Sequence, residues 1–262
     1  MGFSAEEVKN RVKNPFLVRE RLEAAAREGF TALTEDELFL AKWYGLYTHR
    51  HEPGYFMLRL KLPGGLLQSP QLRAIAKIAQ EQNRDFADIT TRQDIQLHWI
   101  KTEDIPKVLN ALQSVGISTL GACGDVLRNV VGCPVAGVDA QELFDATPIL
   151  RQVSDHFLGN PEFANLPRKY KVSIAACREQ CPQPEIHCVS FVGMELRVGE
   201  ERQKGFDIRV GGGLSTKWYF GQRLNAFVTP EQVLPVFRAI TEIWRDSTEY
   251  RKARSKARLK FL

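Results

Sequence analysis

The sequence is poor in cysteine and has no long apolar run. Its 262 residues include five cysteines, an odd number without the dense spacing of a disulfide-stapled secreted domain. No apolar segment follows Met1, and no stretch approaches the ~18 apolar residues that a membrane-spanning helix needs. These absences argue against a disulfide scaffold and a membrane partner. We therefore expect a cytoplasmic protein with reduced thiols.

A phosphate-binding glycine loop is also missing. Gly211-Gly212-Gly213 lacks both the GxGxxG spacing and a following Lys-Ser/Thr pair, and instead predicts a close backbone approach to another group. Hydrophobic residues make up 44% of the chain, enough for a sizeable core in one large domain or two modest ones. The net charge of +5 suits anionic ligands but does not require nucleic acid.

The first 45 residues predict a helical arm that lies over the body of the protein. Ser4 and Thr34 each stand three residues before a glutamate, which is the spacing of a capping box. Pro15 divides the first helical stretch and Gly29 ends it.

Residues 46–117 predict the order strand, helix, strand, helix. Apolar and polar side chains alternate along residues 54–62 and again along residues 89–100, where Trp99 is expected to face the core. Ser69-Pro70 opens the first helix and Thr102 caps the second. The apolar stripe of the first helix is expected at Leu72, Ile75, Ala76 and Ala79. This order is half of a ferredoxin-like α+β sandwich.

Residues 118–262 form a second region. It starts with the glycine-rich stretch GACGDVLRNVVGCPVAG, in which Arg128 is the one cation. We expect a helix over residues 141–158 and a last helix that opens at Thr229-Pro230 and continues to Leu262. Strands are expected at residues 169–174, 189–192 and 206–210.

A strand with two lysines lies in this region. Lys169 and Lys171 point to one side of an extended chain, and Tyr170 and Val172 point to the other. No acidic residue occurs between Leu166 and Arg178, so the two ammonium groups repel each other unless an anion lies over them. The alternative is a solvated strand face, because lysine is usually exposed.

Two cysteines follow this strand with a three-residue spacing. Cys177-x3-Cys181 would bring both thiols onto one helical turn. Two thiols satisfy no common metal site, so no metal ligand is expected in this chain. Cys123, Cys133 and Cys188 are expected as small buried residues.

Five stretches of the chain resemble the N-terminal half of the sirohaem-dependent nitrite and sulfite reductases, in family order and over nearly the whole sequence. They are FMLRLKLPGG from residue 56, TTRQDIQLHW from residue 90, GDVLRNVVGCP from residue 124, LPRKYK from residue 166 and GFDIRVGGGL from residue 205. The resemblance implies an α+β fold. A ferredoxin-like half-domain over residues 46–117 is followed by the first half-repeat of an α/β sirohaem/[4Fe-4S] reductase domain over residues 118–262.

The resemblance also implies a chemistry and a set of site residues. The family reduces nitrite to ammonia or sulfite to sulfide with six electrons from ferredoxin or a flavoprotein, using sirohaem and a [4Fe-4S] cluster. By resemblance, Arg59 and Arg92 on facing strands hold carboxylates of the macrocycle. Arg92, Arg128, Lys169 and Lys171 surround the substrate anion and supply protons, and the latter three also bind the cofactor. Such charge-assisted contacts suit an acidic macrocycle and a small oxyanion.

The chain departs from the family pattern at the cluster ligands. The family uses Cys-x5-Cys and Cys-x3-Cys from a C-terminal half, and no Cys-x5-Cys occurs here; Cys177 and Cys181 resemble an echo of the second element. Because a [4Fe-4S] cluster needs four thiolates placed together, we expect this chain to be an incomplete reductase. It would need a C-terminal half, or a second copy that covers exposed strand edges.

Three readings stay open on the sequence alone. The first is the N-terminal half of a nitrite or sulfite reductase, with the choice of substrate unresolved. The second is a non-catalytic half module that binds sirohaem or a related tetrapyrrole. The third and weakest is nucleic-acid binding through residues 251–262, which carry six Lys or Arg and no acid. The default for that tail is a solvated helix face.

Overall fold

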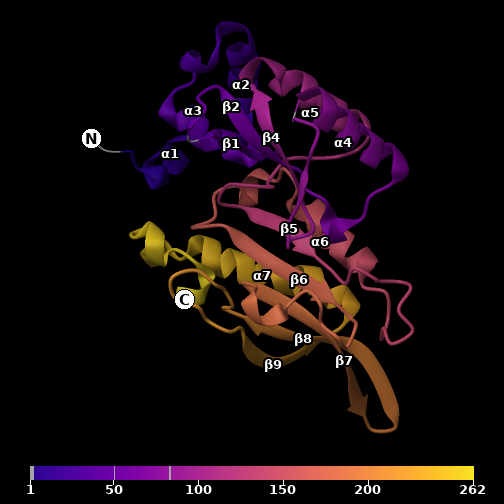
Figure 1. Cartoon of the computed structure of the whole chain (residues 1–262). Coiled ribbons are helices and arrows are strands. Elements are labelled where there is room, and N and C mark those ends of the chain that lie inside the picture. The colour runs from indigo at the N-terminus through magenta and orange to yellow at the C-terminus, as the bar shows by residue number, and fades with distance from the viewer. Residues whose placement is uncertain (1–2, 50, 83) are drawn as a thin grey trace. The chain divides into compact units, whose positions relative to one another are not determined.

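Two β-sheets organise the chain, one in each of two units (Figure 1). The computed structural model describes residues 3–49, 51–82 and 84–262. Unit 1 comprises Met1–Leu62, Leu66–Val126 and Leu158–Asn165, and unit 2 comprises Pro63–Gly65, Leu127–Phe157 and Leu166–Leu262. Both units mix helices with strands, so the expected α+β class is confirmed.

Unit 1 contains a four-stranded antiparallel sheet in the order β1-β2-β4-β3. Its helices are α1 Ala5–Arg11, α2 Val18–Glu28, α3 Glu35–Leu40, α4 Ser69–Gln82 and α5 Ile105–Ser114. Its strands are β1 Leu46–Thr48, β2 Tyr55–Arg59, β3 Asp88–Ile89 and β4 Ile95–Lys101. One apolar core joins the sheet, α4, α5 and the three N-terminal helices.

The predicted helix starts in the N-terminal segment are confirmed. The Ser4 hydroxyl accepts the Glu7 amide at 3.4 Å, and Thr34 with Glu37 forms a reciprocal capping box. Gly29 ends α2 with a φ of 96°, a conformation that glycine adopts without strain.

Two details of the helices on the sheet differ from the prediction. In α4 the buried stripe begins one turn later than expected, since Ile75 and Ile78 are buried whereas Leu72 is exposed. Thr102 does not cap α5; its hydroxyl donates to the Gly54 carbonyl oxygen at 2.9 Å, and a 3₁₀ turn precedes the helix. A threonine hydroxyl satisfies either type of partner, so sequence spacing alone did not distinguish them.

The predicted strand over residues 89–100 is two strands joined by a turn. A β-bulge in β4 places two residues, His98 and Trp99, opposite a single residue of β2. The bulge lies between the pairs Phe56–Ile100 and Leu58–Leu97. Trp99 has a φ of 57°, and Ile100 takes the buried position that alternation assigned to the tryptophan.

His49 lies against this bulge. Its ring stacks on Trp99 at 5.5 Å between centroids and meets the ring of His98 at 5.6 Å. The Nε2 atom of His49 is buried and has no hydrogen-bond partner among the described residues. Burial, followed by the neighbouring His98, lowers the pKa of His49 below its ordinary value.

Unit 2 contains a five-stranded sheet in the order β5-β6-β7-β8-β9. Its strands are β5 Leu127–Val131, β6 Tyr170–Ala175, β7 Val189–Val198, β8 Glu201–Val210 and β9 Gln222–Val228, and its helices are α6 Thr147–Phe157 and α7 Val233–Asp246. β6 pairs in parallel with both β5 and β7, and the remaining pairs are antiparallel. β5 and β9 were not predicted, and α6 is shorter than the predicted helix.

Aromatic side chains join the two helices of unit 2 to its sheet. Phe237 of α7 stacks on Tyr170 of β6 at 5.4 Å and meets Phe157 of α6 at 5.2 Å. Trp244 lies 4.7 Å from the same Tyr170 ring. These rings are buried, and α7 can be followed along the sheet in Figure 1. Such pairs contribute about 0.5–1.5 kcal/mol each beyond their area burial.

The prediction that the last helix continues to Leu262 is wrong. α7 ends at Asp246, and three 3₁₀ turns follow, over Thr248–Arg251, Arg254–Lys256 and Leu259–Phe261. Residues 257–260 are all buried, a run that a surface helix with one buried face does not accommodate. The expected solvated basic face is therefore absent from this part of the tail.

Candidate functional site

Three of the predicted site residues lie on neighbouring strands of unit 2. Arg128 is in β5 and only 6% exposed, whereas Lys171 in β6 and Lys169 just before it are half-buried. β5 and β6 are parallel, with Leu127 opposite Tyr170 and an irregularity in the next residues. Arg128 and Lys171 each follow one member of the pair Leu127–Tyr170, so they occupy neighbouring positions on adjacent strands.

The lysine strand is not a solvated face beyond its first residues. Ser173, which shares the side of Lys171, is buried and donates from its hydroxyl to Ser190 of β7 at 2.9 Å. Ser190 in turn donates to the Pro184 carbonyl oxygen at 2.6 Å. Buried parallel strands are covered on both faces, which explains why the expected polar side continues into the interior.

The other two predicted residues belong to unit 1. Arg59 ends β2, pairs in register with Gln96 of β4, and donates from Nη2 to the Gln96 Oε1 atom at 2.6 Å. The Arg59 Nε atom is buried, and no described residue accepts a hydrogen bond from it. Arg92 is not on a facing strand, which corrects the prediction; it lies in the turn that leads into β4. The Leu60 amide donates to the Ile95 carbonyl oxygen at 2.9 Å, so the turn that carries Arg92 enters β4 beside the end of β2, where Arg59 lies.

The cysteines do not form the arrangement that their spacing predicted. Cys177 is buried and in a β-bridge with Glu142, whereas Cys181 is exposed, and a turn rather than a helix joins them. The Cys177 thiol donates to Asp139 at 3.1 Å. The amide of Glu179 favours the thiolate, but burial and the Asp139 carboxylate outweigh it and raise the pKa of Cys177 to about 11. Cys123, Cys133 and Cys188 are buried, as expected.

The potential metal ligands are not gathered into one site in the part of the chain that the structure describes. Within it, no group of three or more His, Cys, Asp or Glu side chains is placed to hold a metal ion. Cys177 is also held in its protonated form, whereas a cysteine that binds a metal must be a thiolate.

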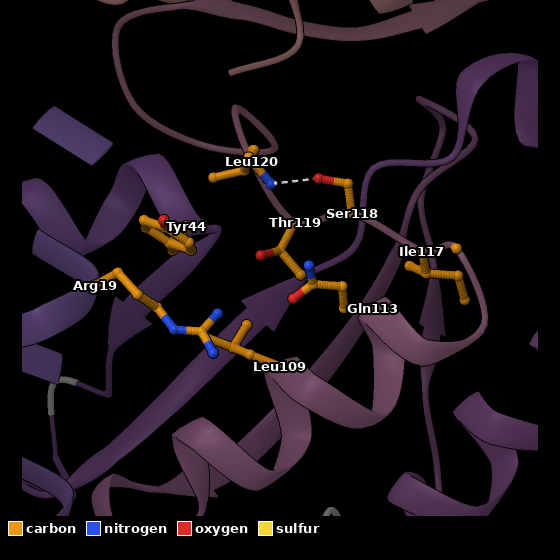
Figure 2. A pocket seen from close by; sticks show the side chains of 9 residues that line it. Arg19, Tyr44, Leu109, Gln113, Ile117, Ser118, Thr119 and Leu120 are labelled. Carbon is orange, nitrogen blue, oxygen red and sulfur yellow. Dashed lines mark hydrogen bonds between the residues drawn. The ribbon is translucent and has the colours of Figure 1, made fainter. Parts of the chain in front are cut away.

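A cavity of about 300 Å³ lies elsewhere in unit 1 (Figure 2). Its walls come from α2, α5, the turn before β1 and the loop after α5. Arg19 is its charged group, and this guanidinium already bonds to Glu23 at 2.7 Å and to Asn110 at 2.8 Å. The cavity is therefore close to neutral, and it contains none of the predicted site residues.

Two buried cations of the C-terminal tail were missed by the prediction. Arg258 and Lys260 are each 7% exposed, although the tail pattern predicted a solvated face. The sequence feature that could have indicated their burial is the absence of any acid from Arg251 onward, because it leaves these charges without a partner nearby in the sequence.

No helix in the described ranges combines the length and apolar character that a bilayer crossing demands.

Two protein-family models match the chain. One is described as nitrite/sulfite reductase ferredoxin-like half domain and matches residues 47–115; the other is described as nitrite and sulphite reductase 4Fe-4S domain and matches residues 123–262.

Curated relatives match over almost the whole chain. A sulfite reductase [ferredoxin] of Mycobacterium tuberculosis (strain H37Rv) is 39% identical and covers 99% of this chain and 49% of its own length. An assimilatory ferredoxin-dependent nitrite reductase of Haloferax mediterranei is 38% identical and covers 93% of this chain and 44% of its own length. The chain thus spans about half the length of the curated relatives it matches.

Solved structures agree with these matches. The structure of the Mycobacterium tuberculosis NirA protein matches with a TM-score of 0.89 and 38% identity, covering 100% of this chain and 50% of that chain. A dissimilatory sulfite reductase I matches with a TM-score of 0.64 at 12% identity, a likeness of fold alone. The family model that covers residues 123–262, more than half of the 262 residues, shows that the chain belongs to the nitrite and sulfite reductase family.

Proposed function

We propose that the chain is the N-terminal half of a sirohaem-dependent nitrite or sulfite reductase. The observation that carries the proposal is the position of buried Arg128 on β5, next to the strand β6 that carries Lys171, inside the segment that matches the reductase domain. The substrates and the macrocycle are both anionic, and basic side chains on neighbouring strands suit such ligands because charge-assisted hydrogen bonds are the stronger ones. The electron donor would be ferredoxin, as the names of the relatives say of those proteins, or a flavoprotein.

The cationic residues fit an acidic macrocycle. Within the described part of the chain the buried Nε–H of Arg59 has no partner, and a carboxylate of the macrocycle would satisfy it. Arg92, Arg128, Lys169 and Lys171 would hold further carboxylates or the substrate anion by charge-assisted hydrogen bonds. When bound, the sirohaem would supply the electrons that reduce the substrate. The residues of this chain would bind and orient the anion and hold protons near its oxygens.

The [4Fe-4S] cluster does not fit this chain. Cys177 is held as a thiol by burial and Asp139, and the described residues gather no three-ligand group. We assign the cluster ligands to a polypeptide segment outside this chain. The chain would then need that segment, or a homodimer partner over its exposed strand edges, in a cytoplasmic setting.

Co-expression with a C-terminal half tests the proposal. The chain is produced together with the C-terminal half of one of the curated reductases, and the complex is examined for a sirohaem absorption spectrum and for viologen-dependent consumption of nitrite and of sulfite. We expect both, with Arg128→Met and Lys171→Met each lowering the affinity for the anion about 10- to 100-fold, the loss of one charge-assisted bond. Arg202→Met is the matched control, because this side chain is 76% exposed on β8. No complex, or no effect of the two site variants, would refute the assignment.

A second candidate is a tetrapyrrole-binding half module without reductase activity. It is favoured by the lack of a gathered metal-ligand group among the described residues. Titration of the chain alone with an iron-free acidic tetrapyrrole, together with iron and sulfide analysis, separates the two. Tight binding with no competence after the C-terminal half is added supports the module.

A further inference from the structure

The cavity of unit 1 has no part in the proposed function. Its volume of about 300 Å³ is at the lower end of the range for small-molecule sites, which is about 300–1,000 Å³. Buried Leu109 and Ile117 supply apolar surface, and Arg19, Gln113 and Thr119 supply polar groups (Figure 2). A cavity of this size suits a ligand with a single ring rather than a macrocycle.

Thr119 brings an unsatisfied hydroxyl to this cavity. The residue is 5% exposed, and its hydroxyl makes no hydrogen bond with another described residue. Figure 2 shows its side chain across the cavity from Tyr44 and Arg19. A buried hydroxyl without a partner is unfavourable, and buried polar groups in proteins are as a rule hydrogen-bonded. A ligand in the cavity would supply the missing partner.

Arg19 has hydrogen-bond donors to spare on the other side of the cavity. A guanidinium carries five N–H groups. Nε donates to Glu23 at 2.7 Å and Nη2 donates to Asn110 at 2.8 Å. The other three N–H groups make no hydrogen bond with a described residue. They can therefore donate to a carbonyl oxygen of a ligand.

The charges at the cavity are already balanced. Among the described residues that line it, Arg19 is the one charged side chain, and Glu23 pairs with it. Burial raises the pKa of Tyr44, so the phenol stays uncharged at neutral pH. A charged ligand would add an unbalanced charge to a partly buried site, which is costly. The cavity thus favours an uncharged ligand.

The Tyr44 ring supplies a flat wall. It is half-buried, and the Arg19 guanidinium lies 5.9 Å from its centroid. Its hydroxyl makes no hydrogen bond with another described residue. Aromatic rings pack in offset-stacked or edge-to-face arrangements, so this wall suits a planar ligand.

We propose that this cavity binds a small, uncharged, planar compound that carries a carbonyl group, of the class of the aromatic amides. Arg19 donates to the carbonyl oxygen, the Thr119 hydroxyl pairs with the amide group, and the ring of the ligand packs against Tyr44. This binding does not rest on the proposed function, because none of the predicted site residues lines the cavity.

Three probes of one shape test the charge of the ligand. Benzamide, benzoate and benzamidine share a ring and a planar head group, and at neutral pH they are uncharged, anionic and cationic. Each probe is titrated into the 262-residue chain, and its binding is followed by saturation-transfer NMR.

One variant tests the hydroxyl. Thr119→Val removes it and keeps the shape of the side chain, and Thr48→Val is the matched control, because Thr48 is exposed in β1. Thr119→Val is expected to keep or raise the unfolding temperature, because it removes an unpaired buried hydroxyl. A lower unfolding temperature than that of Thr48→Val would show that the hydroxyl has another partner, and it would contradict the site.

We expect benzamide to bind the wild type and Thr48→Val equally, and to bind Thr119→Val about 3- to 10-fold more weakly, the loss of one hydrogen bond. Benzoate and benzamidine are expected to bind at least about tenfold more weakly than benzamide, because the cavity balances no further charge. Tighter binding of either charged probe overturns the uncharged ligand class. No binding of benzamide, or equal binding by Thr119→Val and Thr48→Val, refutes the site.

Discussion

The buried ion pair between Lys9 and Asp125 gives the sharpest stability prediction for unit 1. The Lys9 Nζ atom lies 3.3 Å from Asp125 and 2.8 Å from Glu6, and the side chains of Lys9 and Asp125 are 1% and 2% exposed. At an effective dielectric constant of about 20, two charges at this separation attract by about 5 kcal/mol. The pair ties the N-terminal segment to the start of the GDVLRN motif.

Lys9→Met leaves the Asp125 carboxylate buried beside Glu6. We expect the free energy of unfolding to fall by about 3–5 kcal/mol, the usual cost of removing one partner of a buried pair. With a urea dependence of about 2 kcal/mol per molar, the midpoint of equilibrium urea unfolding falls by roughly 1.5–2.5 M. Circular dichroism and tryptophan fluorescence measure it.

Two further variants control this experiment. Lys13→Met, at an exposed position of the same segment, is expected to change the free energy by less than about 0.5 kcal/mol. The double variant Lys9→Met with Asp125→Leu replaces the ion pair by apolar contact and is expected to recover most of the loss. A Lys9→Met midpoint equal to that of Lys13→Met would refute the reasoning, as would a double variant as unstable as the sum of the single ones.

Three other predictions follow from single sites. Gly124→Ala places a Cβ atom 2.9 Å from the buried Trp43 ring at a φ of 84°, so we expect a loss of about 1–3 kcal/mol, visible as a lower unfolding temperature. Asp139→Asn removes the carboxylate that holds the proton of Cys177, so the pKa of that thiol falls below about 11 and its alkylation rate at pH 8–9 rises. Because the pKa of His49 is lowered by folding, the unfolded chain binds more protons between the folded and unfolded pKa values. Stability is then lost as the pH falls through about 6.5, and His49→Phe flattens this dependence; an unchanged pH profile would contradict it.

Local signals in the sequence predicted much of unit 1. The side-chain cap at Ser4, the capping box at Thr34 and the alternation through Phe56 and Leu58 are confirmed, because each depends on residues within one turn or one strand. The bulge at Trp99 was not predictable in this way. It depends on an extra residue opposite β2, a feature of the pairing rather than of the strand.

Unit 2 shows where local signals fail. β5 lies in a glycine-rich stretch that reads as a loop, yet all of its residues are buried between neighbouring elements. The basic tail has helical composition, but burial of Arg258 and Lys260 overrides that propensity. Cys177 and Cys181 are separated by a turn, because the spacing of two thiols fixes no backbone conformation.

The positions of the candidate site residues were also predicted only in part. The resemblance selected Arg128 and Lys171, and the structure places them on adjacent parallel strands. The resemblance also assigned Arg92 to a strand, whereas the structure places this residue in a turn. Their roles toward substrate and cofactor remain predictions that the variants above test.

The parallel pairing of β5 with β6 has a consequence for how the chain acquires its structure. Leu127 can pair with Tyr170 only after α6 and its flanking loops have been synthesised and the chain has folded back on itself. Such distant pairing raises the contact order and slows folding. During that delay the apolar residues of β5 are exposed to other nascent chains, so slower synthesis at low temperature should raise the yield of native protein.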